Sequence, residues 1–206
     1  KDIRALRPRY VLVVPGDHLL KMDYFRFVMH MLDMGAHAAI SVLPRPMEHA
    51  GQLGSLEVDG EGCIRQIREK DPQTPLAFTR EDGQTLFWAS MGIYAFQTQV
   101  LLELLKQEGV LFGRDLLPAL LGQYRVAAYP YEEQNVVYDE GWVHVNGFQV
   151  PEMDVSSDSS YWRDVGTIGE YFQANMDLTG ISPIFNLYGR RWPFLTFRED
   201  RGPAKI

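Results

Sequence analysis

The chain has 206 residues, of which 46% are hydrophobic and 23% are charged. These are ordinary values for a globular protein, and they exclude a disordered or fibrous chain. Lysine and arginine number 20 against 27 aspartates and glutamates, and the resulting net charge of −7 argues against binding of nucleic acid through its phosphates.

The chain carries no sequence sign of a membrane segment. No apolar run approaches the roughly 18–20 residues that cross a bilayer, and the first residues, KDIRALRPRY, lack the apolar core of a signal peptide. The single cysteine, Cys63, cannot form an internal disulfide, which favours a reducing compartment. We therefore expect a soluble cytoplasmic protein.

The N-terminal part predicts a strand, a helix and a second strand. The β-branched run YVLVV at 10–14 is typical of a strand that is covered on both faces. Apolar residues recur with helical spacing over 23–34, with Asp23 as the N-cap and Gly35 as the stop. The run AAISVL at 38–43 is the next buried strand. Strand, helix and strand with short joints predict a parallel sheet.

The middle of the chain predicts a hairpin followed by a buried strand. Segments 53–58 and 63–70 flank a glycine-rich turn and read as the two arms of the hairpin. The apolar run 88–96 is a strand, and a helix follows from 98 to 106.

The C-terminal part predicts two helices and two strands around a polar excursion. A short helix is expected over 115–121 and a strand over 124–129. Residues 132–160 are too long and too polar for a plain loop, and we treat them as an excursion. A strand over 161–165 then leads into a helix that ends near residue 178, opened by the capping box Thr167-Ile168-Gly169-Glu170.

Two aspartates come at the ends of predicted strands. Asp17 follows the strand 10–14, and Asp164 ends the strand 161–165. Ligands of open parallel sheets lie beyond the carboxyl ends of the strands, and Mg²⁺ takes one or two carboxylates while it keeps sites for water and phosphate. The pair therefore predicts a magnesium site. The alternative is that both are turn residues, with Asp164 paired to Arg163.

Three further residues have side chains suited to a sugar phosphate. Lys70 closes the return arm of the hairpin and can hold a phosphate as a point charge, with Glu69 beside it. Ser90 can donate its hydroxyl to a ligand. An exposed charge pair on an edge strand and a buried serine bonded to the backbone are the alternatives.

Several common site motifs do not occur. The five histidines and Cys63 lack the spacing of zinc ligands. Neither G-x-G-x-x-G nor G-x-x-x-x-G-K-[ST] occurs, and Ser90 lacks the flanking glycines of a nucleophile elbow.

Six separated strings resemble, in order, those of the glucose-1-phosphate adenylyltransferases, also called ADP-glucose pyrophosphorylases. The strings are GDH at 16–18, KMDY at 21–24, LG at 53–54, EK at 69–70, ASMGIY at 89–94 and YWRDVGT at 161–167. The resemblance runs from about residue 9 to the end. It implies an α/β nucleotide-diphospho-sugar transferase fold of the GT-A, Rossmann-like kind, with a mixed, mostly parallel sheet and flanking helices, incomplete on its N-terminal side.

The resemblance also implies a reaction and a set of roles. ATP and α-D-glucose 1-phosphate would give ADP-glucose and pyrophosphate, with Mg²⁺ required, as in glycogen or starch synthesis. Asp17 and Asp164 would hold the metal and Lys70 the sugar phosphate. The remaining sugar contacts would come from Gly54, Glu69 and Ser90.

The family pattern further implies an arrangement beyond this chain. Residues 1–180 would be the C-terminal part of the catalytic domain and 181–206 a linker towards a β-helix domain, in an allosteric tetramer whose glycine-rich nucleotide loop lies upstream. The fragment alone would then be inactive and would leave an unpaired sheet edge near 10–14.

Two departures and three alternatives accompany this resemblance. Pro15 replaces a small hydroxyl residue and stiffens the backbone, and Asp71 replaces a proline, so its charge would weaken the hold of Lys70 on phosphate. A sensor of sugar phosphate without catalysis and a pyrophosphorylase for another sugar remain alternatives. A glycosyltransferase with a D-x-D metal motif is less favoured, because no such motif falls at a strand end.

Overall fold

A computed structural model describes residues 3–106, 112–181 and 183–194. The chain divides into two compact units, one of residues 1–18 and 22–135 and the other of residues 19–21 and 136–206. No helix within the described ranges combines the length and the hydrophobicity of a membrane-spanning segment.

The first unit is a seven-stranded sheet with helices. Its strands are β1 (Tyr10–Val13), β3 (Ala38–Pro46), β4 (Ser55–Val58), β5 (Ile64–Arg68), β6 (Ala77–Thr79), β7 (Thr85–Gln97) and β8 (Val126–Pro130). Its helices are α1 (Ile3–Leu6), α2 (Tyr24–Asp33), η1 (Met47–His49), α3 (Thr98–Leu104), η2 (Phe112–Leu116), α4 (Leu117–Leu121) and α5 (Tyr131–Gln134). The mixed α/β class is confirmed.

Strand β7 organises the sheet, whose order is β5-β4-β7-β3-β8. Along one side it pairs with β3, and along the other it pairs in turn with β6, β4 and β1. Because β7 has 13 residues, it is long enough to serve three short partners on one edge. The predicted strand at 88–96 is therefore the longest strand of the sheet.

The directions of the strands differ from the mostly parallel sheet that we expected. Among the described pairings of this sheet only β3 with β8 is parallel. Tyr94 of β7 pairs with Val13 of β1 and with Ile40 of β3, and both pairings are antiparallel. Strands β1 and β3 thus run in the same direction, as the strand–helix–strand pattern predicts, but β7 lies between them. Strand β1 is also less covered than expected, since Leu12 is 37% exposed.

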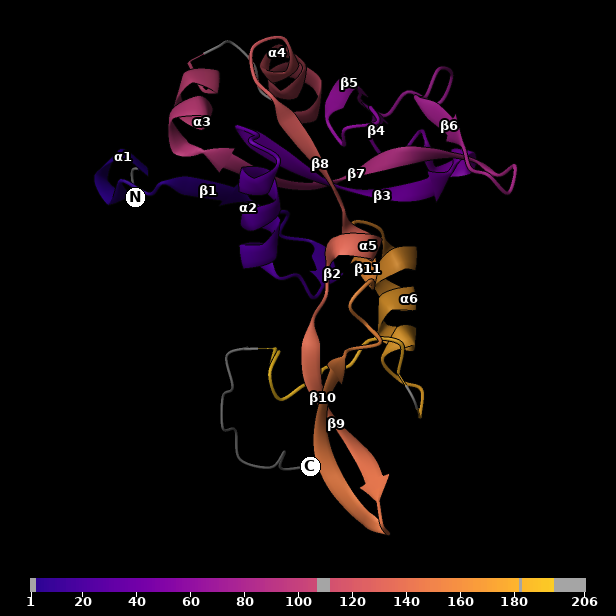
Figure 1. Ribbon diagram of the computed structural model, residues 1–206. Helices are drawn as coiled ribbons and strands as arrows, with labels where there is room; N and C mark the ends of the chain where they lie inside the picture. Colours follow the sequence, from indigo (N-terminus) through magenta and orange to yellow (C-terminus); the bar gives the residue numbers. More distant parts are fainter. Residues whose placement is uncertain (1–2, 107–111, 182, 195–206) are drawn as a thin grey trace, which may run out of the picture. The chain divides into compact units, whose positions relative to one another are not determined.

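Helices cover both faces of this sheet (Figure 1). Residues Ala38–Leu43 of β3 are all buried, and successive side chains of a strand point to opposite faces. On one face Ile40 packs in a cluster with Leu101 of α3 and Leu117 of α4. On the other face the buried Phe27 of α2 contacts the ring of Tyr129, with centroids 5.1 Å apart. Burial of a ring such as Phe27 contributes roughly 2–3 kcal/mol.

The ends of α2 are those that the sequence predicts. The carboxylate of Asp23 accepts hydrogen bonds from the backbone N–H groups of Phe25 and Arg26, at 3.0 and 3.1 Å. Gly35 follows the helix with φ of 60°, a left-handed conformation that glycine adopts without steric cost.

The second unit contains most of the predicted excursion. Its elements are β9 (Tyr138–Val145), β10 (Phe148–Val155), β11 (Trp162–Asp164) and α6 (Ile168–Asp177), together with the end of β2 (His18–Leu20), which pairs with β11. After α5, most of the excursion is the antiparallel hairpin β9–β10.

A buried ion pair joins the segments of this second unit. Lys21 Nζ lies 2.7 Å from Asp158 Oδ2, and both side chains are 1% exposed. The backbone N–H of Asn186 donates to the same Asp158 oxygen, and Phe185 is fully buried. Residues 185–186 therefore pack within this unit, while the predicted domain division at residue 180 stays a prediction.

Candidate active site

The turn that carries Asp17 lies against the segment that carries Ser90. Asp17 is exposed, and its Oδ1 lies 3.9 Å from His18 Nε2. Gly92 has φ of 71°, and a Cβ there would lie 3.2 Å from Cγ of Pro15. A side chain at Gly92 would therefore meet both a strained backbone and the Pro15 ring. Pro15, which departs from the family pattern, therefore packs on Gly92, which matches that pattern.

Three of the predicted sugar-binding residues lie together. The backbone N–H of Ser90 donates to the carbonyl of Gly54 at 2.8 Å. A Cβ on Gly54 would lie 3.0 Å from Oε2 of Glu69 and 3.7 Å from Cβ of Ser90. The Ser90 hydroxyl accepts a hydrogen bond from the backbone of Gly92 at 3.2 Å. The absence of a side chain at Gly54 thus leaves space beside a carboxylate and a hydroxyl.

Three residues beside this group were not selected as candidate site residues from the sequence: Phe112 and Gly113 of η2 and Tyr94 of β7. A Cβ on Gly113 would collide with the carboxylate of Glu69. The ring of Phe112 stacks on Tyr94, with centroids 5.8 Å apart. Burial raises the pKa of the Tyr94 hydroxyl; its hydrogen bond with Ser90 lowers the pKa, and the charge of Glu69 raises it. The sequence signal was present in Tyr94, which ends the ASMGIY string, but Gly113 carried none.

Lys70 is exposed and adopts a left-handed backbone conformation, with φ of 48°. Such a conformation costs a non-glycine residue roughly 1–2 kcal/mol and is found at functional sites. The next residue, Asp71, accepts hydrogen bonds from the backbone of Gln73 and from the Thr74 hydroxyl, at 2.9 and 2.7 Å. Hydrogen bonds from Thr74 and Gln73 lower the pKa of Asp71. The Asp71 carboxylate, which we expected to offset the charge of Lys70, thus stabilises the turn that follows Lys70.

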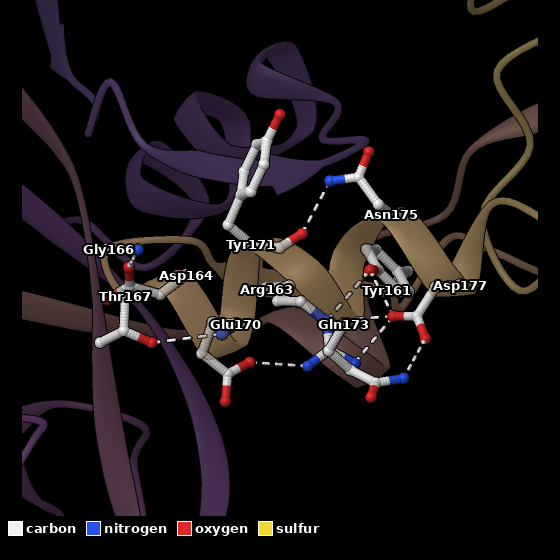
Figure 2. A network of polar contacts seen from close by, with 10 residues as sticks. All are labelled: Tyr161, Arg163, Asp164, Gly166, Thr167, Glu170, Tyr171, Gln173, Asn175 and Asp177. Carbon is white, nitrogen blue, oxygen red and sulfur yellow. Dashed lines mark hydrogen bonds and ion pairs between the residues drawn. The ribbon is translucent and has the colours of Figure 1, made fainter.

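Asp164 ends β11 in the second unit, and Figure 2 shows its surroundings. One carboxylate oxygen accepts from the backbone N–H of Gly166 at 2.8 Å, so Asp164 does shape the turn before α6. Thr167 caps that helix by accepting from the backbone of Glu170 at 3.2 Å. The predicted capping box is half formed, because the Glu170 carboxylate binds Arg163 at 2.7 Å.

The structure thus brings Gly54, Glu69 and Ser90 together in the first unit, with the Asp17 turn against Gly92. Lys70 adjoins Glu69 in the chain. Asp164 belongs to the second unit, on the strand that pairs with β2. The roles of all these residues stay predictions.

Comparison with known proteins identifies the family. A family model described as "Nucleotidyl transferase" matches residues 2–180. The chain belongs to the nucleotidyl transferase family. Its resemblance to this kind of enzyme, predicted from six short strings, is confirmed.

This nucleotidyl transferase is similar to several curated proteins named glucose-1-phosphate adenylyltransferase. It is 35% identical to the protein of Paramagnetospirillum magneticum, 34% to that of Dechloromonas aromatica and 36% to that of Shewanella baltica. Each alignment covers 99% of this chain but only 44%, 43% and 45% of the respective relative. The chain therefore spans less than half the length of these relatives.

Proposed function

We propose that this chain contributes the sugar-binding half of a site that transfers an adenylyl group from ATP to α-D-glucose 1-phosphate. The products are ADP-glucose and pyrophosphate, as in the synthesis of glycogen-type glucans. The observation that supports this best is the grouping of Gly54, Glu69 and Ser90 in a chain about 35% identical, over nearly its whole length, to proteins named for this reaction. We also infer a cytoplasmic location, an allosteric enzyme and a tetramer for the protein that contains the chain.

The chemistry is a direct displacement. A phosphate oxygen of glucose 1-phosphate attacks the α-phosphorus of ATP, a new P–O bond forms, and the bond between the α- and β-phosphates breaks. Pyrophosphate leaves with the electron pair of that bond. No side chain has to form a covalent intermediate, so the protein contributes positioning and neutralisation of charge.

Each residue of the first unit has a role in this proposal. The carboxylate of Glu69 accepts hydrogen bonds from sugar hydroxyls, and the hydroxyl of Ser90 adds another polar contact. Gly54 leaves room for the sugar beside them. Lys70 holds the phosphate of the sugar as a point charge, and the left-handed backbone at Lys70 fixes where its side chain starts.

We propose Asp17 and Asp164 as the magnesium ligands. Both are carboxylates, the hard oxygen donors that Mg²⁺ prefers. Asp17 stands two residues before Leu19, and the strand that contains Leu19 pairs with the strand that Asp164 ends. This connectivity supports the pairing of the two acids. Mg²⁺, when bound, would neutralise charge on the phosphate oxygens.

The test uses the complete protein that contains this chain. Purified protein should release pyrophosphate from ATP only when glucose 1-phosphate and Mg²⁺ are present. Replacement of either acid, by Asp17→Asn or Asp164→Asn, should reduce kcat at least a hundredfold without loss of folding. A folded protein that binds glucose 1-phosphate but releases no pyrophosphate would indicate the sensor alternative. Faster reaction with another nucleotide or another sugar phosphate would indicate a different pyrophosphorylase.

A further inference from the structure

The loop of residues 69–76, which joins β5 to β6, contains an unfavourable backbone conformation at Lys70 (Figure 1). Lys70 has φ of 48°. In this left-handed conformation the Cβ atom approaches the following carbonyl oxygen, and a residue with a side chain disfavours it by a factor of about 5 to 30. Contacts within the loop must therefore outweigh this preference.

Pro72 is one reason why the bend of the chain falls on Lys70. The ring of a proline disfavours a helical backbone at the residue before it and favours an extended one, and that residue here is Asp71. Accordingly, the backbone bends at residues 69–70 but not at Asp71. The Pro72 ring is itself packed, since a Cβ added to Gly51 would lie 3.5 Å from its Cβ atom.

The Asp71 carboxylate closes the turn that follows. Its Oδ1 accepts hydrogen bonds from the backbone N–H groups of Gln73 and Thr74, at 2.9 and 3.2 Å, and its Oδ2 accepts one from the Thr74 hydroxyl at 2.7 Å. Arg68, at the end of β5, donates through Nη1 to the carbonyl oxygen of Thr74. Thr74 is thus tied both to Asp71 and to the strand that precedes Lys70, so the chain path between them is closed.

The backbone is the main restraint on where the Lys70 side chain points. Lys70 is exposed, and the part of the chain that the structure describes gives its ammonium group no hydrogen bond or ion pair. A long side chain without such a partner is directed by the backbone from which it starts. A change of Lys70 to an extended conformation would therefore send the ammonium group in a different direction.

We propose that Asp71 is a positioning residue: its hydrogen bonds to Gln73 and Thr74 hold Lys70 in the backbone conformation from which its ammonium group reaches the phosphate of the sugar. This rests on the proposed function, in which Lys70 binds that phosphate. Both oxygens of Asp71 face N–H and O–H groups of its own turn. Asp71 thus supports the binding of phosphate through the shape of the loop, whereas the sequence led us to expect that its charge weakens this binding.

The expected magnitude follows from the population of the left-handed conformation. The apparent affinity of a ligand falls in proportion to the fraction of the protein that is competent to bind it. If every contact that favours this conformation were lost, the competent fraction would fall by the same factor of about 5 to 30. The contacts of Arg68 and Pro72 remain when Asp71 is replaced, so we expect Asp71→Ala to raise the KM for glucose 1-phosphate by about three- to tenfold.

The test compares two replacements of Asp71 in the complete protein, by initial rates of pyrophosphate release and by thermal unfolding. Asp71→Ala removes all three hydrogen bonds, whereas Asp71→Asn removes the charge but keeps an oxygen for the N–H groups of Gln73 and Thr74. Alanine should raise the KM for glucose 1-phosphate, while asparagine should keep it within about twofold. In both variants kcat and the KM for ATP should change by less than about twofold, because only binding of the sugar phosphate depends on Lys70.

Two more variants test the contact from its other end and control for the loss of a carboxylate. Thr74→Val removes one hydrogen bond but leaves the charge of Asp71, and it should raise the same KM by less than Asp71→Ala does. It also serves if Asp71→Ala does not fold. Asp82→Ala is the matched control, because Asp82 likewise accepts a backbone hydrogen bond, from Gln84 at 2.9 Å, in the turn between β6 and β7. This variant should leave the KM unchanged.

Three results would overturn the proposal. If Asp71→Ala and Asp71→Asn both lower the KM for glucose 1-phosphate, the charge of Asp71 opposes Lys70, and the proposed function stands. If Asp71→Ala lowers only the unfolding temperature, Asp71 is merely structural, and the proposed function again stands. If Lys70→Gln leaves the KM for glucose 1-phosphate unchanged, Lys70 does not bind the phosphate, so its assignment in the proposed function fails and the positioning role fails with it.

Discussion

Replacement of Gly113 by alanine places a methyl group where the carboxylate of Glu69 now lies. Glu69 is exposed and its carboxylate is the far end of a flexible side chain, so the carboxylate should move rather than the fold. Alanine at a position with ordinary φ also restricts the unfolded chain, which stabilises by about 0.4–1 kcal/mol. We therefore expect the free energy of unfolding of Gly113→Ala to stay within about 1 kcal/mol of the original.

The effect on the sugar site should be larger. A hydrogen bond to a charged group is worth about 1.5–3 kcal/mol, and each 1.4 kcal/mol is tenfold in affinity. If Glu69 binds a sugar hydroxyl, its displacement should raise the KM for glucose 1-phosphate by about 10- to 150-fold and leave the KM for ATP nearly unchanged. Initial rates of pyrophosphate release by the complete protein, at varied glucose 1-phosphate, measure this directly.

Two companion variants make the result decisive. Gly122→Ala is the control, because no atom of the described residues lies within 4 Å of its added Cβ, apart from its own helix and chain neighbours. Its KM should not change. Glu69→Ala removes the carboxylate outright and should match Gly113→Ala. If Glu69→Ala raises the KM and Gly113→Ala does not, the collision does not displace Glu69. If neither variant raises it, Glu69 does not bind the sugar.

Three further predictions concern stability. Gly92→Ala should lower the free energy of unfolding by about 1–2 kcal/mol, because alanine resists a φ of 71° and its Cβ would crowd Pro15; an unchanged urea midpoint would refute this. The buried Tyr129 hydroxyl has no hydrogen-bond partner among the described residues. Tyr129→Phe should therefore raise the free energy of unfolding by about 1 kcal/mol. A lower free energy of unfolding, measured with urea, would show that the hydroxyl has a partner. Burial raises the pKa of Asp177, but its hydrogen bonds together lower the pKa by a larger amount, so the pKa lies below the ordinary value. The stability that Asp177 adds is therefore complete above its unfolded pKa of about 3.9 and is lost as pH falls through the folded pKa. Between pH 3 and 6 the free energy of unfolding of Asp177→Asn should therefore change less with pH than that of the original protein. Identical pH profiles of the two proteins would contradict this account.

Local structure followed from local sequence. The N-cap at Asp23, the glycine stop at Gly35 and the cap at Thr167 all occur where they were predicted. Each depends on a side chain and a backbone group only a few residues apart, so their chemistry is visible in a short string. The buried strand at 38–43 was equally clear, because both of its faces require apolar residues.

Part of the candidate site was also visible in the sequence. Gly54, Glu69 and Ser90 were selected from strings that resemble a known family, and the fold brings them together. Gly113 was missed because its part is steric: it leaves room for the Glu69 carboxylate, and nothing in its own neighbourhood of the sequence shows this.

The amino-acid sequence by itself determined many of the elements, several of their ends and the family, since propensity, capping and short motifs are properties of neighbouring residues. Only the tertiary structure decided how the elements pair. Strand β7 lies antiparallel between β1 and β3, where the sequence pattern predicts a mostly parallel sheet. Arg163 forms ion pairs with Asp177 and Glu170 rather than with Asp164. Those choices depend on which distant segments bury surface and pair charges most favourably, a balance that becomes defined only when the whole chain has packed.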